Sequence, residues 1–157
     1  MTDYQPLSAS DQKPKPATHH TTRHQSQVKA TLPFNDVRSF DNAQRGFIAS
    51  LEPLRIAHQD ADRSALDLTA FDFLTDECPD TVNPSLWRQA QLNAQHHGLF
   101  EVTDGIYQVR SFDIANMTLV RGETGWIVID PLTCSESSNA ALKLANAHLG
   151  HREVVAV

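Results

Sequence analysis

Polar and apolar residues alternate over several short segments in the second half of the chain, as is typical of β-strands with one buried face. The segments 99–102 and 106–110 flank a Thr-Asp-Gly turn, and an Asp-Gly pair is a strong signal for a β-hairpin. A second hairpin is predicted by the strand 117–121, the turn 122–125 and the strand 126–129. The strand 126–129 is nearly all apolar, as expected where both faces of a sheet are covered.

Helical periodicity is clearest in the segment that precedes these strands. Asn83 is a favourable N-cap, and Pro84 stands at the first helical position, where its missing N–H costs nothing. The helix is expected to close at Gly98, directly after His97. Its predicted apolar face consists of Leu86, Trp87, Ala90 and Ala94.

The pattern is weaker further upstream. Asp41 is expected to cap a short helix that ends before Pro53. The apolar stripe of this helix would consist of Ala43, Phe47, Ile48 and Leu51. Residues 57–70 are acidic and only weakly periodic, so no element is predicted there. A brief alternation at 71–74 favours either a short strand or a loop anchored by aromatic side chains.

The C-terminal segment has the pattern of strand, helix and strand. Thr133 and Glu136 form a capping box, which predicts a helix over 134–149. Its inner face is expected to carry Ala141, Leu142, Ala145, His148 and Leu149. A strand over 153–157 follows, and the length and order of these elements suit a βαβ crossover. We therefore predict a fold of the α/β (α+β) class.

Residues 1–31 are polar and contain almost no large apolar side chain. Such a segment buries too little surface to offset its ordering entropy, so we predict a disordered polar tail, with order beginning near Phe34. The chain is thus expected to comprise this tail, a helical region over 32–98 and a strand-rich region over 99–157.

Composition and charge narrow the function classes. A net charge of −6 leaves no basic surface for nucleic acid, and the chain has no apolar run of the ~20 residues that a membrane helix needs. The N-terminus lacks the apolar core of a secretory signal, which makes a cytoplasmic location the default. Cys78 and Cys134 are far apart, and two free thiols are favoured over a disulfide.

Asp130 is the best candidate for a functional residue. It follows a buried strand and precedes Pro131, which places its carboxylate at the carboxyl edge of the predicted sheet. Two interpretations stand side by side: the carboxylate accepts hydrogen bonds from the next loop and fixes the turn, or it orients metal ligands without contacting the metal.

No other residue supports a mechanism inside these 157 residues. The histidines show neither His-x-His nor His-x-x-x-His spacing with an acid nearby, and no serine lies in a G-x-S-x-G turn. A solvated polar stretch is favoured over a metal site for His19, His20 and His24, and helix-end roles are favoured for His96, His97, His148 and His151. We assign no catalytic residue and no metal ligand.

Four stretches of the sequence resemble the N-terminal part of the alkyl sulfatases, the SDS-hydrolysing enzymes of the metallo-β-lactamase superfamily. They are FDNAQRGFIA at 40–49, DTVNPSLWRQAQLN at 80–93, HGLFEVTDGIYQVR at 97–110 and DIANMTLVRGETGWIVIDPL at 113–132. The resemblance runs from about residue 34 to the end. It implies that residues 99–157 are the first strands and helix of a truncated metallo-β-lactamase αββα sandwich.

The resemblance also implies a chemistry for the full-length family. Two zinc ions would activate a water molecule that hydrolyses alkyl sulfate esters, such as dodecyl sulfate, to an alcohol and sulfate. In the family a strand like 154–157 leads into a His-x-His-x-Asp-His metal motif, which is absent from this sequence. Asp130 matches the strand-end Asp of the family, which is not a metal ligand. We therefore expect this chain to bind no zinc and to be inactive alone, although the full-length family is expected to be homodimeric.

Two other interpretations remain open at this point. In one, the chain is a naturally short module for binding or dimerisation. In the other, it is a gene remnant without function. Some relatives are periplasmic or secreted, so the resemblance does not assign a compartment.

Overall fold

Two consecutive hairpins form the centre of a six-stranded sheet in the computed structural model, which describes residues 15–157. Both hairpins were predicted from the alternating pattern, and the Asp-Gly turn at Gly105 has the positive φ, 74°, that this turn requires. The strands are β4 (Gly98–Thr103), β5 (Ile106–Arg110), β6 (Met117–Arg121) and β7 (Trp126–Ile129), and each pairs antiparallel with the next.

The predicted strand-helix-strand unit is confirmed. After β7 the chain forms α4 (Ser135–Leu149) and returns as β8 (Val154–Ala156), which pairs parallel with β7. The capping box is wrong, however, because Cys134 is the N-cap and no side chain caps the helix. Thr133 instead donates both its N–H and its hydroxyl to Asp113, so a tertiary contact has replaced the local cap.

A strand replaces the predicted helix over 41–51. The helix α2 (Arg38–Gln44) is short, and β1 (Phe47–Ala49) joins the sheet by antiparallel pairing with β4. Gly46 explains the change, because a side chain there would collide with the carbonyl oxygen of Glu101 on β4. Only glycine permits this close approach of the two backbones, and Glu101 donates its N–H to the carbonyl oxygen of Gly46 at 2.7 Å.

The weakly periodic segment forms a second, small sheet that the pattern does not predict. It consists of the hairpin β2 (Arg55–Ala57) and β3 (Ser64–Asp67), followed by the 3-10 helix η2 (Leu68–Thr75). The predicted strand or loop at 71–74 is thus helical. Asp67 caps η2 by accepting a hydrogen bond from the N–H of Thr69 at 3.0 Å.

The helix α3 (Pro84–Gln95) begins as predicted, with the Asn83 side chain accepting from the N–H of Ser85 at 2.9 Å. Trp87 is buried and donates its indole N–H to the carbonyl oxygen of Asp76. Leu86, however, is 63% exposed, so its place on the buried face is corrected. Gly98 belongs to β4 and not to the helix end.

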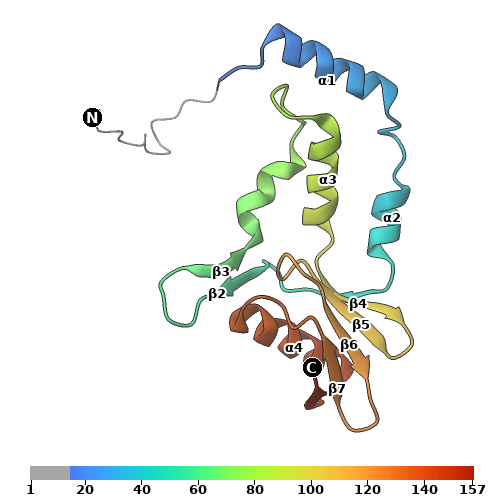
Figure 1. Ribbon diagram of the computed structural model, residues 1–157, viewed down its shortest axis with the longest axis vertical. Helices are drawn as coiled ribbons and strands as arrows, with labels where there is room; N and C mark the ends of the chain where they lie inside the picture. The colour runs from blue at the N-terminus through green and yellow to red at the C-terminus, as the bar shows by residue number, and fades with distance from the viewer. Residues whose placement is uncertain (1–14) are drawn as a thin grey trace.

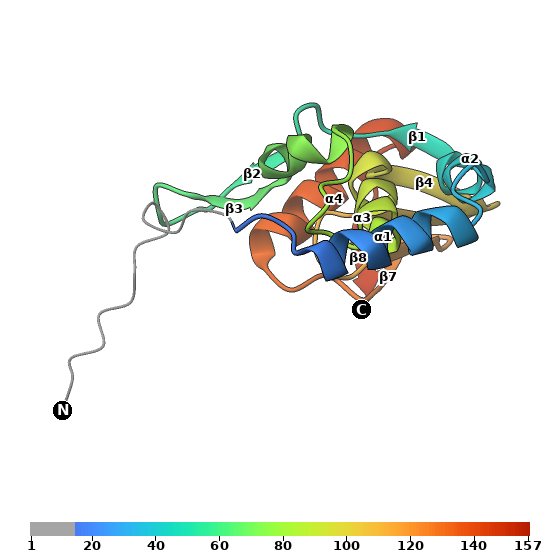
Figure 2. The same cartoon turned by 90° about the horizontal axis from the view of Figure 1, so that it is seen from above.

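The N-terminal segment is more ordered than its composition suggests. The helix α1 (His19–Thr31) occupies most of the described part of the predicted disordered tail, and its N-cap Thr18 accepts from the N–H of Thr21. Residues 1–14 of that tail lie outside the described residues. Figure 1 places α1 and α4 at opposite ends of the molecule, and Figure 2 shows the β2–β3 hairpin and the α2–β1 segment on opposite sides of α3. The predicted helical region 32–98 also contains the strands β1, β2 and β3, so it is helical only in part.

One face of the sheet carries the main core. Helix α4 covers this face with Ala141, Leu144 and Ala145. The sequence pattern did not predict the burial of Leu144. It predicted that His148 faces inward, but His148 is exposed. The sheet residues buried on this face are Leu99, Tyr107, Val109, Met117, Leu119, Trp126 and Val128.

The opposite face is apolar but largely uncovered near β7 and β8. Ile129 is 56% exposed and Val155 is 53% exposed, and Ile127 is exposed as well. β8 is also an edge strand, because the strand order ends with it. In the part of the chain from residue 15 onward, no helix combines the length and hydropathy needed to cross a membrane.

We expect the isolated chain to self-associate, because an apolar face next to an open strand edge favours pairing between chains. The substitution Val155→Lys should shift the chain toward monomer by placing a charge on this edge. Val37→Lys, at a position equally exposed but outside the sheet, should leave the association unchanged. Sedimentation velocity measures both, and a monomeric unsubstituted chain with a sharp unfolding transition would contradict the expectation.

Candidate functional site

Two loops meet at the carboxyl edge of the central strands. β5 and β7 run in the same direction because each is antiparallel to β6, and β8 runs parallel to β7. All three strands therefore end at one edge of the sheet, where ligands commonly bind in α/β proteins. The loop 111–116 follows β5 and the loop 130–134 follows β7. We take this edge as the candidate site.

Backbone strain is concentrated in these two loops. Within residues 15–157, the non-glycine residues with positive φ are Ser111 at 62°, Asp130 at 55° and Leu132 at 72°. L-residues adopt this conformation rarely, and such residues cluster where surrounding structure or function imposes them.

Asp113 holds the two loops together. One carboxylate oxygen accepts both the N–H of Thr133, at 2.7 Å, and the Thr133 hydroxyl, while the other accepts the N–H of Ile114 at 2.6 Å. Partial burial raises the pKa of Asp113, but the hydrogen bonds from Thr133 and Ile114 together lower it by more. The pKa of Asp113 therefore lies below its usual value. The carboxylate is therefore charged at neutral pH.

Asp130 has a different environment. Its side chain is exposed at the start of the loop, and no hydrogen bond joins its carboxylate to any residue that the structure describes. The turn-fixing role that the sequence offered as one interpretation is performed by Asp113, which sequence reasoning missed. Thr133 lies 20 positions from Asp113, so no local signal connects the two.

A cavity of about 890 Å³ opens beside this edge, and we refer to it as the edge cavity. It lies between the loops just described, the first turn of α4, and the elements β3, η2 and α3. Its apolar wall includes Leu66, Leu68, Phe71, Leu74 and Leu92. Its volume falls within the range of small-molecule pockets, which is about 300–1,000 Å³.

The basic residues that line the edge cavity are Arg110 and His96. Arg110, the last residue of β5, lies over the ring of Phe100 at 4.4 Å and donates its Nε–H to Gln108 at 3.1 Å. His96 follows α3, and its Nε2 atom is buried without a hydrogen-bond partner among the described residues. Desolvation lowers the pKa of both groups, which leaves His96 neutral at pH 7.

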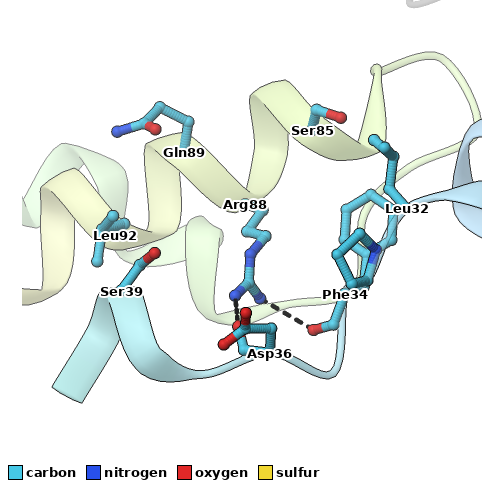
Figure 3. Close-up of a pocket in the computed structure, with 9 residues that line it drawn as sticks. Leu32, Phe34, Asp36, Ser39, Ser85, Arg88, Gln89 and Leu92 are labelled. Atoms are coloured by element: carbon cyan, nitrogen blue, oxygen red, sulfur yellow. Dashed lines mark hydrogen bonds between the residues drawn. The ribbon is translucent and has the colours of Figure 1, made fainter. Parts of the chain in front are cut away.

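A smaller cavity of about 260 Å³ lies between α3 and the linker that joins α1 to α2. Figure 3 shows Arg88 reaching from α3 to this linker, where it donates to the carbonyl oxygen of Phe34 at 3.0 Å and to that of Asp36. Its guanidinium also lies 4.8 Å from the centre of the Phe40 ring. Arg88 is thus committed to holding the linker in place, and this cavity offers no free charge to a ligand.

The remaining histidines and cysteines do not converge. His97 shares a hydrogen bond of 2.6 Å with the Ser50 hydroxyl, and His58 lies 3.7 Å from Glu136. Cys78 and Cys134 are both free, as expected from the sequence. No group of three or more His, Cys, Asp or Glu side chains between residues 15 and 157 is arranged to hold a metal ion.

Comparisons with known proteins identify relatives across nearly the whole chain. A linear primary-alkylsulfatase of Pseudomonas sp is 46% identical over 147 residues, or 91% of this chain, and an alkyl/aryl-sulfatase of Saccharomyces cerevisiae is 46% identical over 82%. The solved structure of a stereoselective inverting sec-alkylsulfatase from Pseudomonas sp matches 90% of the chain, with a TM-score of 0.82 and 44% identity. The chain is homologous to alkylsulfatases over most of its length. No protein-family model matches it.

The chain spans about a fifth of the length of its alkylsulfatase relatives. It covers 21% and 20% of the two curated enzymes, and 22% of the solved sec-alkylsulfatase chain. This coverage agrees with an N-terminal portion of an alkylsulfatase, as the sequence resemblance indicated, and the mixed α and β fold is confirmed as well.

In this chain, Asp113→Ala should loosen the two edge loops. The change leaves the N–H of Thr133 without its acceptor, which typically costs about 1–3 kcal/mol of unfolding free energy. Urea unfolding measures the loss, and hydrogen exchange at the Thr133 amide should accelerate. Asp113→Asn keeps one acceptor oxygen and should lose less. Asp104→Ala, in an exposed turn at the other end of the sheet, is the matched control, and an equal effect there would contradict the role of Asp113.

Proposed function

We propose that this chain is the N-terminal part of a zinc-dependent alkylsulfatase that hydrolyses alkyl sulfate esters, such as dodecyl sulfate, to an alcohol and sulfate. The observation that carries the proposal is the identity of 44–46% to alkylsulfatases, which extends over 82–98% of the chain. The substrate class and the reaction belong to the longer protein. This chain contributes the sheet edge, its two loops and the helices that pack above them.

We also propose that the six-stranded sheet is one half of a metallo-β-lactamase αββα sandwich. The distribution of exposed residues supports this, because α4 covers one face and the other presents Ile127, Ile129 and Val155. A second sheet packed on that face would bury these side chains, as in other two-sheet folds. We further propose that the full-length protein is a homodimer, as the family resemblance implies.

The two zinc ions implied by the family resemblance do not fit the residues at hand. Bound zinc would lower the pKa of a water molecule and turn it into a nucleophile at neutral pH. Zinc sites need three or four side-chain ligands, and no such set converges between residues 15 and 157. We therefore propose that other residues of the longer enzyme supply its metal ligands.

The purified 157-residue chain should hold no stoichiometric zinc and should release no sulfate from dodecyl sulfate. A polypeptide that continues the same reading frame into a His-x-His-x-Asp-His motif should do both. Elemental analysis and ion chromatography of released sulfate make the comparison. About one zinc per chain in the 157-residue form would contradict the absence of a ligand set, and an inactive longer form would contradict the proposed function.

Asp130→Asn tests whether the strand-end carboxylate serves the metal centre. In an active longer form, the change should lower zinc affinity or turnover by roughly ten- to a hundred-fold, the usual size of effects from groups that orient metal ligands. Asp130 is exposed here and has no hydrogen-bond partner in the described chain, so the fold itself should be unaffected. Asp104→Asn is the control. Wild-type zinc content and turnover in Asp130→Asn would show that the Asp130 carboxylate does not serve the metal centre.

A further inference from the structure

The helix α1 has little packing to support it. None of its residues is buried, and its first turn has no acidic residue to complement the helix dipole. It contacts α3, and Figure 1 places it at the end of α3 that lies away from the sheet. A polar helix of this length is marginal in water without further interactions. A ligand that binds only the helical form would therefore add stability to α1.

The helical conformation creates a pair of neighbouring imidazoles. His20 and His24 are four positions apart, so in α1 their side chains lie on one side of the helix, one turn apart, with about 5–6 Å between their Cβ atoms. Both residues are exposed, so both imidazoles are open to a solute. Two histidines at this spacing on a helix can hold the same metal ion. The sequence favoured a solvated stretch here because a disordered tail fixes no such spacing.

The third histidine of the cluster does not share this geometry. His19 is one position from His20 and five from His24, and residues at these spacings do not face each other along a helix. Its ring meets that of His20 edge-on, with 6.1 Å between the ring centres. From residue 15 onward, no third His, Cys, Asp or Glu side chain joins the pair to complete a set of metal ligands. The pair is therefore an open site with two protein ligands, and water would occupy the other positions around a bound ion.

The chemistry of the two ligands selects a class of metal ion. Imidazole nitrogen suits Cu²⁺, Ni²⁺ and Zn²⁺, whereas Mg²⁺ and Ca²⁺ prefer oxygen ligands. For a given nitrogen site, affinity among these ions is highest for Cu²⁺. The positive end of the helix dipole opposes any cation near the start of α1, which further favours the ion that binds imidazole most strongly.

We propose that His20 and His24 form a surface chelating site for a divalent transition-metal ion, preferentially Cu²⁺, and that the bound ion stabilises α1 by joining its first two turns. The site lies outside the proposed sulfatase chemistry and does not rest on it. Two protein ligands hold zinc far less firmly than the three or four of a zinc centre, so zinc bound here would be lost on dialysis. The dialysed chain would still contain no stoichiometric zinc.

The test titrates the 157-residue chain with CuCl₂, NiCl₂, ZnCl₂ and MgCl₂ in a buffer that does not bind metal ions. Calorimetry gives the affinities, and electron paramagnetic resonance of the Cu²⁺ form gives the number of nitrogen ligands. We expect two nitrogen ligands, tighter binding of Cu²⁺ than of Ni²⁺ or Zn²⁺, and no binding of Mg²⁺. Hydrogen exchange, followed by mass spectrometry, should slow in α1 when Cu²⁺ is bound and stay unchanged in α3.

The decisive variant moves one imidazole along the helix without changing the composition. His24→Ser combined with Ser26→His exchanges two exposed residues and leaves His20 with no histidine three or four positions away. It should weaken Cu²⁺ binding at least about tenfold, because the second imidazole is no longer held at a high effective concentration beside the first. His24→Ala should lose as much. His19→Ala is the matched control, because it removes an exposed histidine next to the pair and should leave the affinity unchanged.

Equal losses in His19→Ala and His24→Ala, or wild-type affinity in the exchanged variant, would overturn the inference. So would a Cu²⁺ spectrum with a single nitrogen ligand, or tighter binding of Zn²⁺ than of Cu²⁺. Binding without slower exchange in α1 would keep the site and overturn the stabilisation of the helix. All the substituted residues are exposed, so the rest of the fold should not change. Because no turnover is measured, failure of this inference would leave the proposed function untouched, and an inactive longer form would leave the metal site untouched.

Discussion

The burial of Trp126 ties the last three elements of the fold to one another. Its indole N–H donates to the side-chain oxygen of Asn146 on α4 at 2.9 Å, and its backbone N–H donates to Glu153 just before β8. Asn146 also accepts the N–H of Arg152, whose guanidinium lies over the indole ring. A buried tryptophan needs such a partner for its N–H. One side chain thus sets the position of α4 and, through it, the direction of β8.

This anchor acts on one face of the sheet only, which makes the structure asymmetric. The face under α4 is sealed, while the face beyond Ile127 and Ile129 is apolar and open. An open apolar face of this kind favours association. The chain with this asymmetric sheet spans about a fifth of the length of its relatives.

At the carboxyl edge of the sheet, hydrogen bonds to one carboxylate hold two strained loops beside the edge cavity. The hydrogen bonds of Asp113 join the two loops and so offset the conformational strain of Ser111 and Leu132, which have positive φ angles. The same loops line the edge cavity. Folding therefore carries a local conformational cost at this edge. Such a cost is common where stability and binding compete for the same residues.

Local pattern was sufficient for the elements whose signals are short in range. The alternating strands, the Asp-Gly turn, the Asn-Pro start of α3 and the strand-helix-strand order all follow from neighbouring residues, and the family resemblance follows from contiguous motifs. Pattern failed where a partner distant in the sequence decided the outcome. Phe47 joins a strand because Gly46 lets β1 approach β4. Thr133 does not cap its helix, because its N–H and its hydroxyl both donate to Asp113.

The candidate site divides in the same way. The sequence alone placed Asp130 at a strand end, since a buried strand followed by Asp-Pro is a local signal. It did not identify Asp113, Arg110 and His96 as neighbours of one cavity, because they belong to a loop, a strand end and a helix end. Only the tertiary structure decided their grouping. The Arg110 guanidinium packs on Phe100 and the His96 ring on Phe40, and the desolvation that results is a property of the packed chain.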